Sequence, residues 1–211
     1  MASCNLCGTV VQSWQDCPEG PVKCPTCRSV GRHRAVGKLF EIVAPRRADL
    51  VFDLGGDGVM CSAYSRRMIS VDISYDGATV HGNLGHLPIR TGTTTLALCL
   101  DVLEHVRDDV KAVRELKRVM APGGSAFVTA SCWALHGPSK TPPDAGLAEW
   151  HLDMAGEWAS RCFRYYTDES LLRLLADRHF DVERVVYTDH ALAIYDVVMF
   201  VLRKPAAGAH K

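Results

Sequence analysis

Short apolar runs and helically spaced apolar positions follow one another along most of the chain. Apolar runs favour buried strands, and the strands expected from the pattern are residues 50–54, 68–73, 95–100, 126–130, 180–187 and 193–202. Between and before them, apolar residues recur at helical spacing, and the helices expected are residues 35–43, 109–120 and 167–178. Strands that alternate with helices predict an α/β fold with a mostly parallel sheet.

The segment before the first helix contains paired cysteines and has no helical period. Cys4 and Cys7 form one C-x-x-C motif, Cys24 and Cys27 form a second, and sixteen residues separate the two motifs. This spacing favours a structural zinc site, because two thiolates from each turn complete a closed tetrahedron. Metal binding would then fold a segment too small to fold alone. A redox pair and free thiols are the alternatives, and Cys17 is a weaker candidate ligand.

The pattern divides the chain into a small module, a helical connection and a larger domain. We expect a four-cysteine zinc ribbon and, after it, a linking helix that Pro45 ends. The larger domain contains an irregular, lid-like insert rich in Pro, Gly, Trp and His, and a flexible tail follows it. The expected boundaries are 1–32 for the ribbon, 33–47 for the linking helix, 48–204 for the domain, 132–164 for the insert and 205–211 for the tail.

Composition and charge restrict the classes of function. The 211 residues are 47% hydrophobic and 23% charged, and Lys+Arg and Asp+Glu both number 24. A formal net charge of zero argues against a protein that chiefly binds nucleic acid through its phosphates, although a local basic patch stays open. No apolar run approaches the roughly 20 residues of a membrane span. The N-terminal residues lack the features of a signal peptide, so we expect a cytoplasmic protein.

Three glycines follow the first strand of the larger domain. They lie in the segment Val51-Phe-Asp-Leu-Gly-Gly-Asp-Gly58, where glycine lets the backbone turn sharply and approach a ligand closely. Asp72 ends the next strand, seventeen residues after Gly55, and a carboxylate there can accept hydrogen bonds from ribose hydroxyls. The alternative is a tight strand-to-helix turn without a ligand.

With the glycine turn, several further motifs occur in order, and together they resemble one family. The segment from about 48 to 187 is similar to class I S-adenosylmethionine (SAM)-dependent methyltransferases of the type 11 kind. The resemblance implies a Rossmann-like, doubly wound sheet whose last strand is antiparallel. The motifs that carry the resemblance are Val51–Gly58, Leu87–Ile89, Leu100–Val106, Glu115–Gly124 and Arg164–Asp168.

The resemblance implies roles for individual residues. Asp72 would hold the ribose hydroxyls, Ile73 would lie beside the adenine, and Leu100 and Asp101 would end a strand next to the methyl donor. One departure from the family motif is Asp57, which stands where the family has a loop glycine. The residues that the resemblance places at the cofactor are Asp53, Gly55, Gly56, Gly58, Asp72, Ile73, Asn83, Leu84, Leu100 and Asp101.

The candidates for catalysis follow from their position near the transferred methyl group. They are Asp101, His105, His151 and Tyr165. A base is needed only where the acceptor atom starts protonated. Some relatives use a similar carboxylate–histidine motif to bind a divalent metal, so Asp101, Glu104 and His105 could hold Mg²⁺ with a histidine of the insert. The alternative is that Glu104 and His105 only pack the following turn.

Three functions remain open from the sequence. The first is transfer of a methyl group from SAM to a small metabolite, with S-adenosylhomocysteine as the second product. The second is methylation of RNA, in which the ribbon and nearby basic residues would grip phosphates. The third is a non-catalytic zinc-ribbon adaptor. The oligomeric state is open, with a homodimer as one option. The basic residues of the second hypothesis are Arg28, Arg32, His33, Arg34, Arg46 and Arg47.

Overall fold

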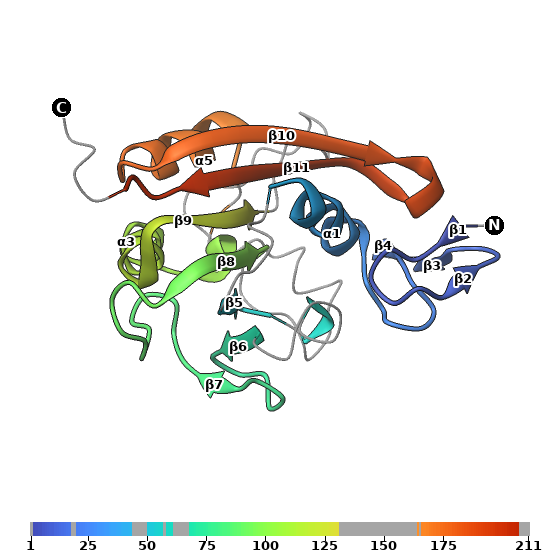
Figure 1. Cartoon of the computed structure of the whole chain (residues 1–211), viewed down its shortest axis with the longest axis horizontal. Helices are drawn as coiled ribbons and strands as arrows, with labels where there is room; N and C mark the ends of the chain where they lie inside the picture. Colours follow the sequence, from blue (N-terminus) through green and yellow to red (C-terminus); the bar gives the residue numbers. More distant parts are fainter. Residues whose placement is uncertain are drawn as a thin grey trace.

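A seven-stranded sheet forms the centre of the computed structural model, in the order β10-β11-β9-β8-β5-β6-β7 (Figure 1). The model describes residues 2–17, 20–43, 50–56, 58–60, 68–130, 164 and 166–206. All neighbouring strands run parallel except at β11, which is antiparallel to both β9 and β10. The predicted doubly wound sheet with an antiparallel last strand is therefore confirmed. The strands are β5 Val51–Leu54, β6 Met68–Asp72, β7 Val80–His81, β8 Thr94–Leu100, β9 Met120–Thr129, β10 Asp181–Asp189 and β11 Ile194–Arg203.

Helices cover both faces of this sheet, and the central strand β8 shows why. Leu96 and Leu98 are buried in one hydrophobic cluster with the helix α1, Gly31–Val43. Ala97 and Cys99 are buried in a second cluster with the helices α3, Asp109–Val119, and α5, Asp168–Ala176. Successive side chains of a strand point to opposite faces, so a wholly apolar strand needs cover on both. Among the helices that the structure describes, none is long and apolar enough to cross a bilayer.

Most of the predicted elements lie within a few residues of their expected positions, and four details differ. Strand β9 begins at Met120, six residues before the expected start at residue 126. The predicted cap of α5 is present, because Thr167 Oγ1 accepts the Ser170 N–H and Ser170 Oγ accepts the Thr167 N–H. Helix α1 begins at Gly31 rather than at residue 35, because its first turn is polar and its apolar period starts later. Helix α5 ends at Ala176, two residues before the expected end. The short strand β7 was not predicted, since two residues are too few to show an apolar run or an alternation of apolar and polar side chains.

The N-terminal segment forms two small hairpins at one end of the molecule (Figure 1). In the first, β1 (Ala2–Ser3) pairs with β2 (Val10–Val11), and in the second β3 (Gln15–Cys17) pairs with β4 (Gly20–Lys23). Leu6 is buried in the same cluster as α1 and the inner residues of β11. The Trp14 indole N–H donates to Ala191 O at 3.2 Å. The hairpins therefore share a hydrophobic core with one face of the sheet.

The buried side chain of Arg34 joins the hairpins, α1 and the end of the β10–β11 hairpin. Its guanidinium is fully buried and lies over the Trp14 ring, 4.4 Å from the centroid. It donates to the carbonyls of Leu192 at 2.6 Å and Ala193 at 2.9 Å, and also to the Ser29 carbonyl. A further bond reaches Val22 O at 3.2 Å. The planar, forked guanidinium suits several acceptors at once.

The replacement Arg34→Met is expected to lower the free energy of unfolding by about 3 kcal/mol, because buried carbonyls lose their donor. Urea unfolding followed by circular dichroism measures the change. The matched control is Arg28→Met, since Arg28 is exposed and a surface substitution usually changes stability by less than about 0.5 kcal/mol. Equal stability of the two variants would contradict the role assigned to Arg34.

Candidate active site and metal centre

A cavity of about 550 Å³ lies where strands β5, β6 and β8 end. Strand β5 has β6 on one side and β8 on the other, so the chain order reverses at this point. Ligands of open α/β sheets bind at such a switch point. Six of the ten predicted cofactor residues line the cavity, namely Gly55, Asp72, Ile73, Asn83, Leu84 and Asp101.

The glycine turn after β5 is required by its backbone conformation and its close contacts. Gly55 has a φ of +75°, and its N–H donates to Val71 O at 2.7 Å. A Cβ at Gly55 would overlap the Val102 side chain, and a Cβ at Gly56 would overlap the buried Asp53 carboxylate. Gly58 has a φ of +81°. Asp53, Gly56 and Gly58 do not line the cavity, and they shape the turn beside it. Asp57 lies outside the described residues.

Asp72 and Ile73 form one wall of the cavity. Asp72 Oδ1 accepts the backbone N–H groups of Ser74 and Tyr75, both at 2.7 Å. The structure records no hydrogen bond from a described residue to the other oxygen, Oδ2, so this oxygen can serve a ligand. Ile73 is 68% exposed, which is unusual for a large apolar side chain. The pair offers a charged acceptor next to an apolar surface.

Asn83 and Leu84 lie in the loop after β7 and line the same cavity. Asn83 Oδ1 accepts the Gly85 N–H at 2.7 Å, and its carbonyl accepts the His86 N–H at 2.8 Å. These two bonds fix the loop and the orientation of the amide. Leu84 is buried in the core cluster of α3 and α5, so it connects the cavity floor to the hydrophobic core.

Asp101 forms another wall of the cavity and has a strained backbone. Its φ is +55°, a left-handed conformation that costs a non-glycine residue about 1–3 kcal/mol. Its N–H donates to Thr129 O at 3.0 Å, and Thr129 Oγ1 donates to Asp101 Oδ1 at 2.7 Å. Arg32 Nη1 lies 3.3 Å from Asp101 Oδ2. Leu100, directly before it, is 7% exposed and does not line the cavity.

The other predicted catalytic residues divide into one that the structure brings to the cavity and two that it does not describe. His105 ends the 3-10 helix Leu103–His105 and lines the cavity. His151 and Tyr165 lie outside the described residues. Glu104 is fully buried, which fits packing better than an open Mg²⁺ site. The described residues therefore give the predicted Mg²⁺ no support.

The sequence did not indicate that Arg107 and Arg32 lie at or beside the cavity. Arg107 lines the cavity, and it directly follows the Leu100–Val106 motif, so its position could have drawn attention to it. Arg32 contacts Asp101 across 69 positions of sequence. No local pattern could have indicated that contact.

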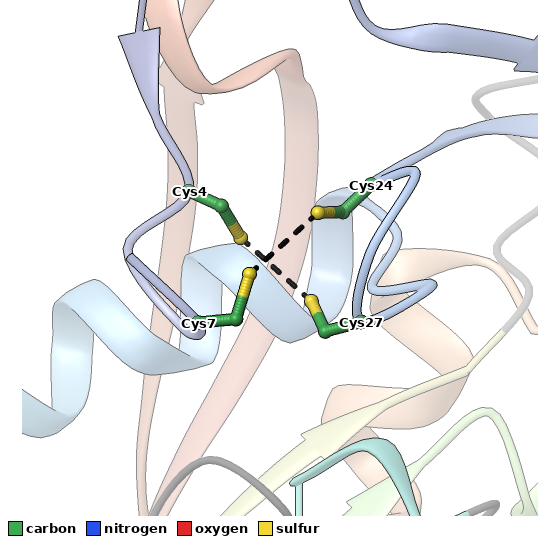
Figure 2. Close-up of side chains that lie close together, drawn as sticks. All are labelled: Cys4, Cys7, Cys24 and Cys27. Carbon is green, nitrogen blue, oxygen red and sulfur yellow. Dashed lines mark hydrogen bonds between the residues drawn. The ribbon is translucent and has the colours of Figure 1, made fainter. Parts of the chain in front are cut away.

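The four cysteines converge as the spacing predicts (Figure 2). The sulfur atoms of Cys4 and Cys27 lie 3.8 Å apart, those of Cys7 and Cys24 also lie 3.8 Å apart, and all four are within 4.8 Å of one another. Zn–S bonds of about 2.3 Å in a tetrahedron place sulfurs about 3.8 Å apart. The four residues therefore fit a zinc ion. Among the described residues, this is the only group of three or more metal-ligand side chains close enough to hold an ion.

The two C-x-x-C turns have the same backbone geometry. In the first, the Gly8 N–H donates to Cys4 O at 2.8 Å, and in the second the Arg28 N–H donates to Cys24 O at 2.9 Å. The residue after each second cysteine is left-handed, with a φ of +73° at Gly8 and +62° at Arg28. Repeated turns of this kind present two sulfurs each to a shared centre.

The environment shifts the pKa values of two of the thiols in opposite directions. Burial raises the pKa of the Cys27 thiol to about 12. At Cys7, burial also acts to raise the pKa, but hydrogen bonds with Thr9, Cys27 and Cys4 together outweigh it and lower the pKa to about 6. A bound metal ion stabilises the thiolate form of its ligands, so it would deprotonate both.

The comparisons with known proteins agree with this geometry. Residues 50–128 match the family model described as a methyltransferase domain. A curated protein of Mycolicibacterium smegmatis, named a probable S-adenosylmethionine-dependent methyltransferase, is 30% identical over 109 residues. The match covers 46% of this chain and 38% of the relative, so the chain spans well under half of that protein's length.

Solved structures show the same fold at low sequence identity. One is a chain of the complex between the Haloferax volcanii Trm112 methyltransferase activator and a methyltransferase, with a TM-score of 0.64 and 14% identity, covering 85% of this chain and 92% of that chain. Another is an S-adenosylmethionine-dependent methyltransferase of Mesorhizobium loti, with a TM-score of 0.60 and 16% identity. The match covers 81% of this chain and 98% of that chain.

The sheet order and the cavity at its switch point define a class I methyltransferase fold. The family match places a methyltransferase domain on residues 50–128, and the resemblance that the motifs indicated is confirmed.

We expect the purified chain to contain one zinc ion, and Cys24→Ser to lose it, because three thiolates leave the tetrahedron open. Mass spectrometry measures the zinc content of each chain. The melting temperature shows whether the loss of zinc also lowers the stability of Cys24→Ser. Cys99→Ala is the matched control, since Cys99 is buried in the sheet core away from the cluster. Full zinc content in Cys24→Ser would contradict the assignment of this site.

Proposed function

We propose that the chain transfers the methyl group of SAM to a nitrogen, oxygen or sulfur atom of a small-molecule metabolite. The observation that carries the proposal is the cavity at the switch point, with Asp72 and Ile73 on one wall and Asp101 on another. Its volume of about 550 Å³ suits a ligand of nucleoside size. The methyltransferase-domain match over the same strands supports this use of the cavity.

The residues of the cavity suit the separate parts of the cofactor. Asp72 Oδ2 would accept hydrogen bonds from the ribose hydroxyls, which are strong because the acceptor is charged. Ile73 would offer its exposed apolar side chain to the adenine. Gly55 lets the main chain approach the methionine part, because it has no Cβ. When bound, SAM would supply a methyl group on a sulfonium: the acceptor atom would bond to the methyl carbon in line with the breaking carbon–sulfur bond, and S-adenosylhomocysteine would leave.

The chain's own contribution to the transfer is chiefly positioning. Holding the acceptor in line with the methyl group and excluding water lowers the barrier without covalent catalysis. Thr129 donates to one oxygen of Asp101, and Arg32 is paired with the other. We therefore assign Asp101 a structural role in the cavity wall and not the role of a catalytic base. His105 lines the same cavity and is the candidate base for an acceptor that starts protonated. Roles for His151 and Tyr165 remain predictions.

The placement of the basic segment favours a small molecule over RNA. His33 and Arg34 are buried, and Arg32 is paired with Asp101, so these three side chains are not presented to phosphates on a surface. Arg28 is exposed. Arg46 and Arg47 lie outside the described residues. RNA methylation remains the second candidate, and the experiments below distinguish it.

The replacement Asp72→Ala is expected to weaken binding of SAM at least tenfold, because two charge-assisted hydrogen bonds to the ribose are lost. Isothermal titration calorimetry measures the dissociation constant. Asp76→Ala is the matched control, since Asp76 is an exposed carboxylate in the same loop. An affinity that Asp72→Ala leaves unchanged would show that the cofactor does not use this wall.

Transfer of labelled methyl groups from SAM into a fractionated cell extract tests the acceptor class. We expect label in the small-molecule fraction. Comparing the yield with and without Mg²⁺ tests whether the transfer needs that ion. Label in RNA would instead favour the second candidate. A chain that binds no SAM at all would favour a zinc-ribbon adaptor without catalysis.

A further inference from the structure

The four-cysteine site and the first turn of α1 are adjacent in the chain. Only four residues separate Cys27 from Arg32, the second residue of the helix. The turn of the second cysteine pair ends in a bond from the Cys24 N–H to Ser29 O at 2.9 Å. The Val30 N–H then donates to His33 Nδ1 at 3.2 Å. The start of α1 is thus fixed by the geometry of the cysteine site.

Arg32 extends from this first turn to the edge of the cofactor cavity. Its Nη1 lies 3.3 Å from Asp101 Oδ2, and both side chains are 28% exposed. A half-buried ion pair of this kind is screened less by solvent than a pair on the open surface. The contact therefore joins the beginning of α1 to the end of strand β8.

Asp101 depends on this contact because its conformation is strained. With a φ of +55°, it keeps its position only where neighbouring groups hold it. Thr129 on β9 holds one carboxylate oxygen, and Arg32 on α1 holds the other. Since Asp101 lines the cavity, any movement of its carboxylate changes the wall that a cofactor would contact.

We propose that Arg32 is a positioning residue through which the four-cysteine site holds Asp101 in the wall of the cofactor cavity, so that metal occupancy sets the affinity for the cofactor. The inference rests on the proposed function, because it assumes that the cavity binds SAM. It assigns the N-terminal module a role in the methyltransferase site that neither the fold nor the family match requires.

The coupling has a reciprocal consequence. If the metal raises the affinity for the cofactor by a given factor, the cofactor raises the affinity for the metal by the same factor. A chain that lacks zinc and a zinc-loaded chain that lacks Arg32 have lost the same contact. Both should therefore show the same reduced affinity for the cofactor.

The first experiment measures binding of S-adenosylhomocysteine by calorimetry to zinc-loaded Arg32→Gln. The dissociation constant is expected to rise about fivefold to tenfold, with one zinc per chain and an unchanged melting temperature. Arg32→Lys should recover most of the affinity. The contact at 3.3 Å involves one nitrogen, so it depends on the positive charge and not on the two-pronged geometry of a guanidinium. Arg114→Gln is the matched control, since Arg114 is exposed on α3.

A double-mutant cycle separates the positioning role from a general loss of stability. Asp101→Asn removes the charge that Arg32 holds. Adding Arg32→Gln to Asp101→Asn should then change the dissociation constant by less than about twofold, because the two replacements break one interaction. Full additivity of the two effects would overturn the proposal.

The third measurement is the zinc affinity, obtained by competition with a chelator. Saturating S-adenosylhomocysteine should raise the apparent zinc affinity of the natural chain about fivefold to tenfold, and that of Arg32→Gln less than twofold. A wild-type chain that binds no S-adenosylhomocysteine overturns both this inference and the proposed function. A wild-type chain that binds it with the same affinity as Arg32→Gln overturns only the role of Arg32.

Discussion

The buried guanidinium of Arg34 connects the cysteine site with the methyltransferase sheet. Four thiolates and one Zn²⁺ carry a net charge of about −2, and such a cluster needs nearby donors and cations to be stable inside a protein. Burial lowers the pKa of Arg34, while the thiolates of Cys4, Cys24 and Cys27 act in the opposite direction. Desolvation of a cation is costly unless its protons are satisfied. Carbonyls from three separate segments satisfy them here.

This arrangement makes the N-terminal hairpins part of the sheet's own core. Leu6 and Val11 share a cluster with Ile194 and Met199 of β11, so the hairpins cover apolar surface that would otherwise face water. The opposite face is covered by α3 and α5. A sheet with two apolar faces needs both layers, and the cysteine module helps α1 to supply the second one (Figure 1).

The sequence predicted the features that are encoded by local patterns. Apolar runs located the strands, the capping residues located the start of α5, and two C-x-x-C pairs located the cysteine site. The glycine turn and Asp72 located one wall of the cavity. These signals succeed because each is a short motif, or two motifs less than about twenty residues apart in the sequence.

Contacts between distant segments were not predictable in this way. The pairing of Arg32 with Asp101 and the bonds of Arg34 to Leu192 depend on how the sheet brings remote residues together. A polar residue in a helix that will be buried looks like a surface residue in the sequence. The basic segment was for this reason open to interpretation as a phosphate-binding patch, although His33 and Arg34 are buried.

The carbonyls that accept from Arg34 also set an order of events during synthesis. The first of its acceptors on the C-terminal hairpin, Leu192, lies 158 positions after Arg34 in the chain. At translation rates of 5–20 residues per second, that interval lasts about 8–30 s. Throughout it, the cysteines are on the emerging chain without the strands that cover them. The N-terminal module therefore gains its contacts with the sheet only after the C-terminal hairpin has been synthesised.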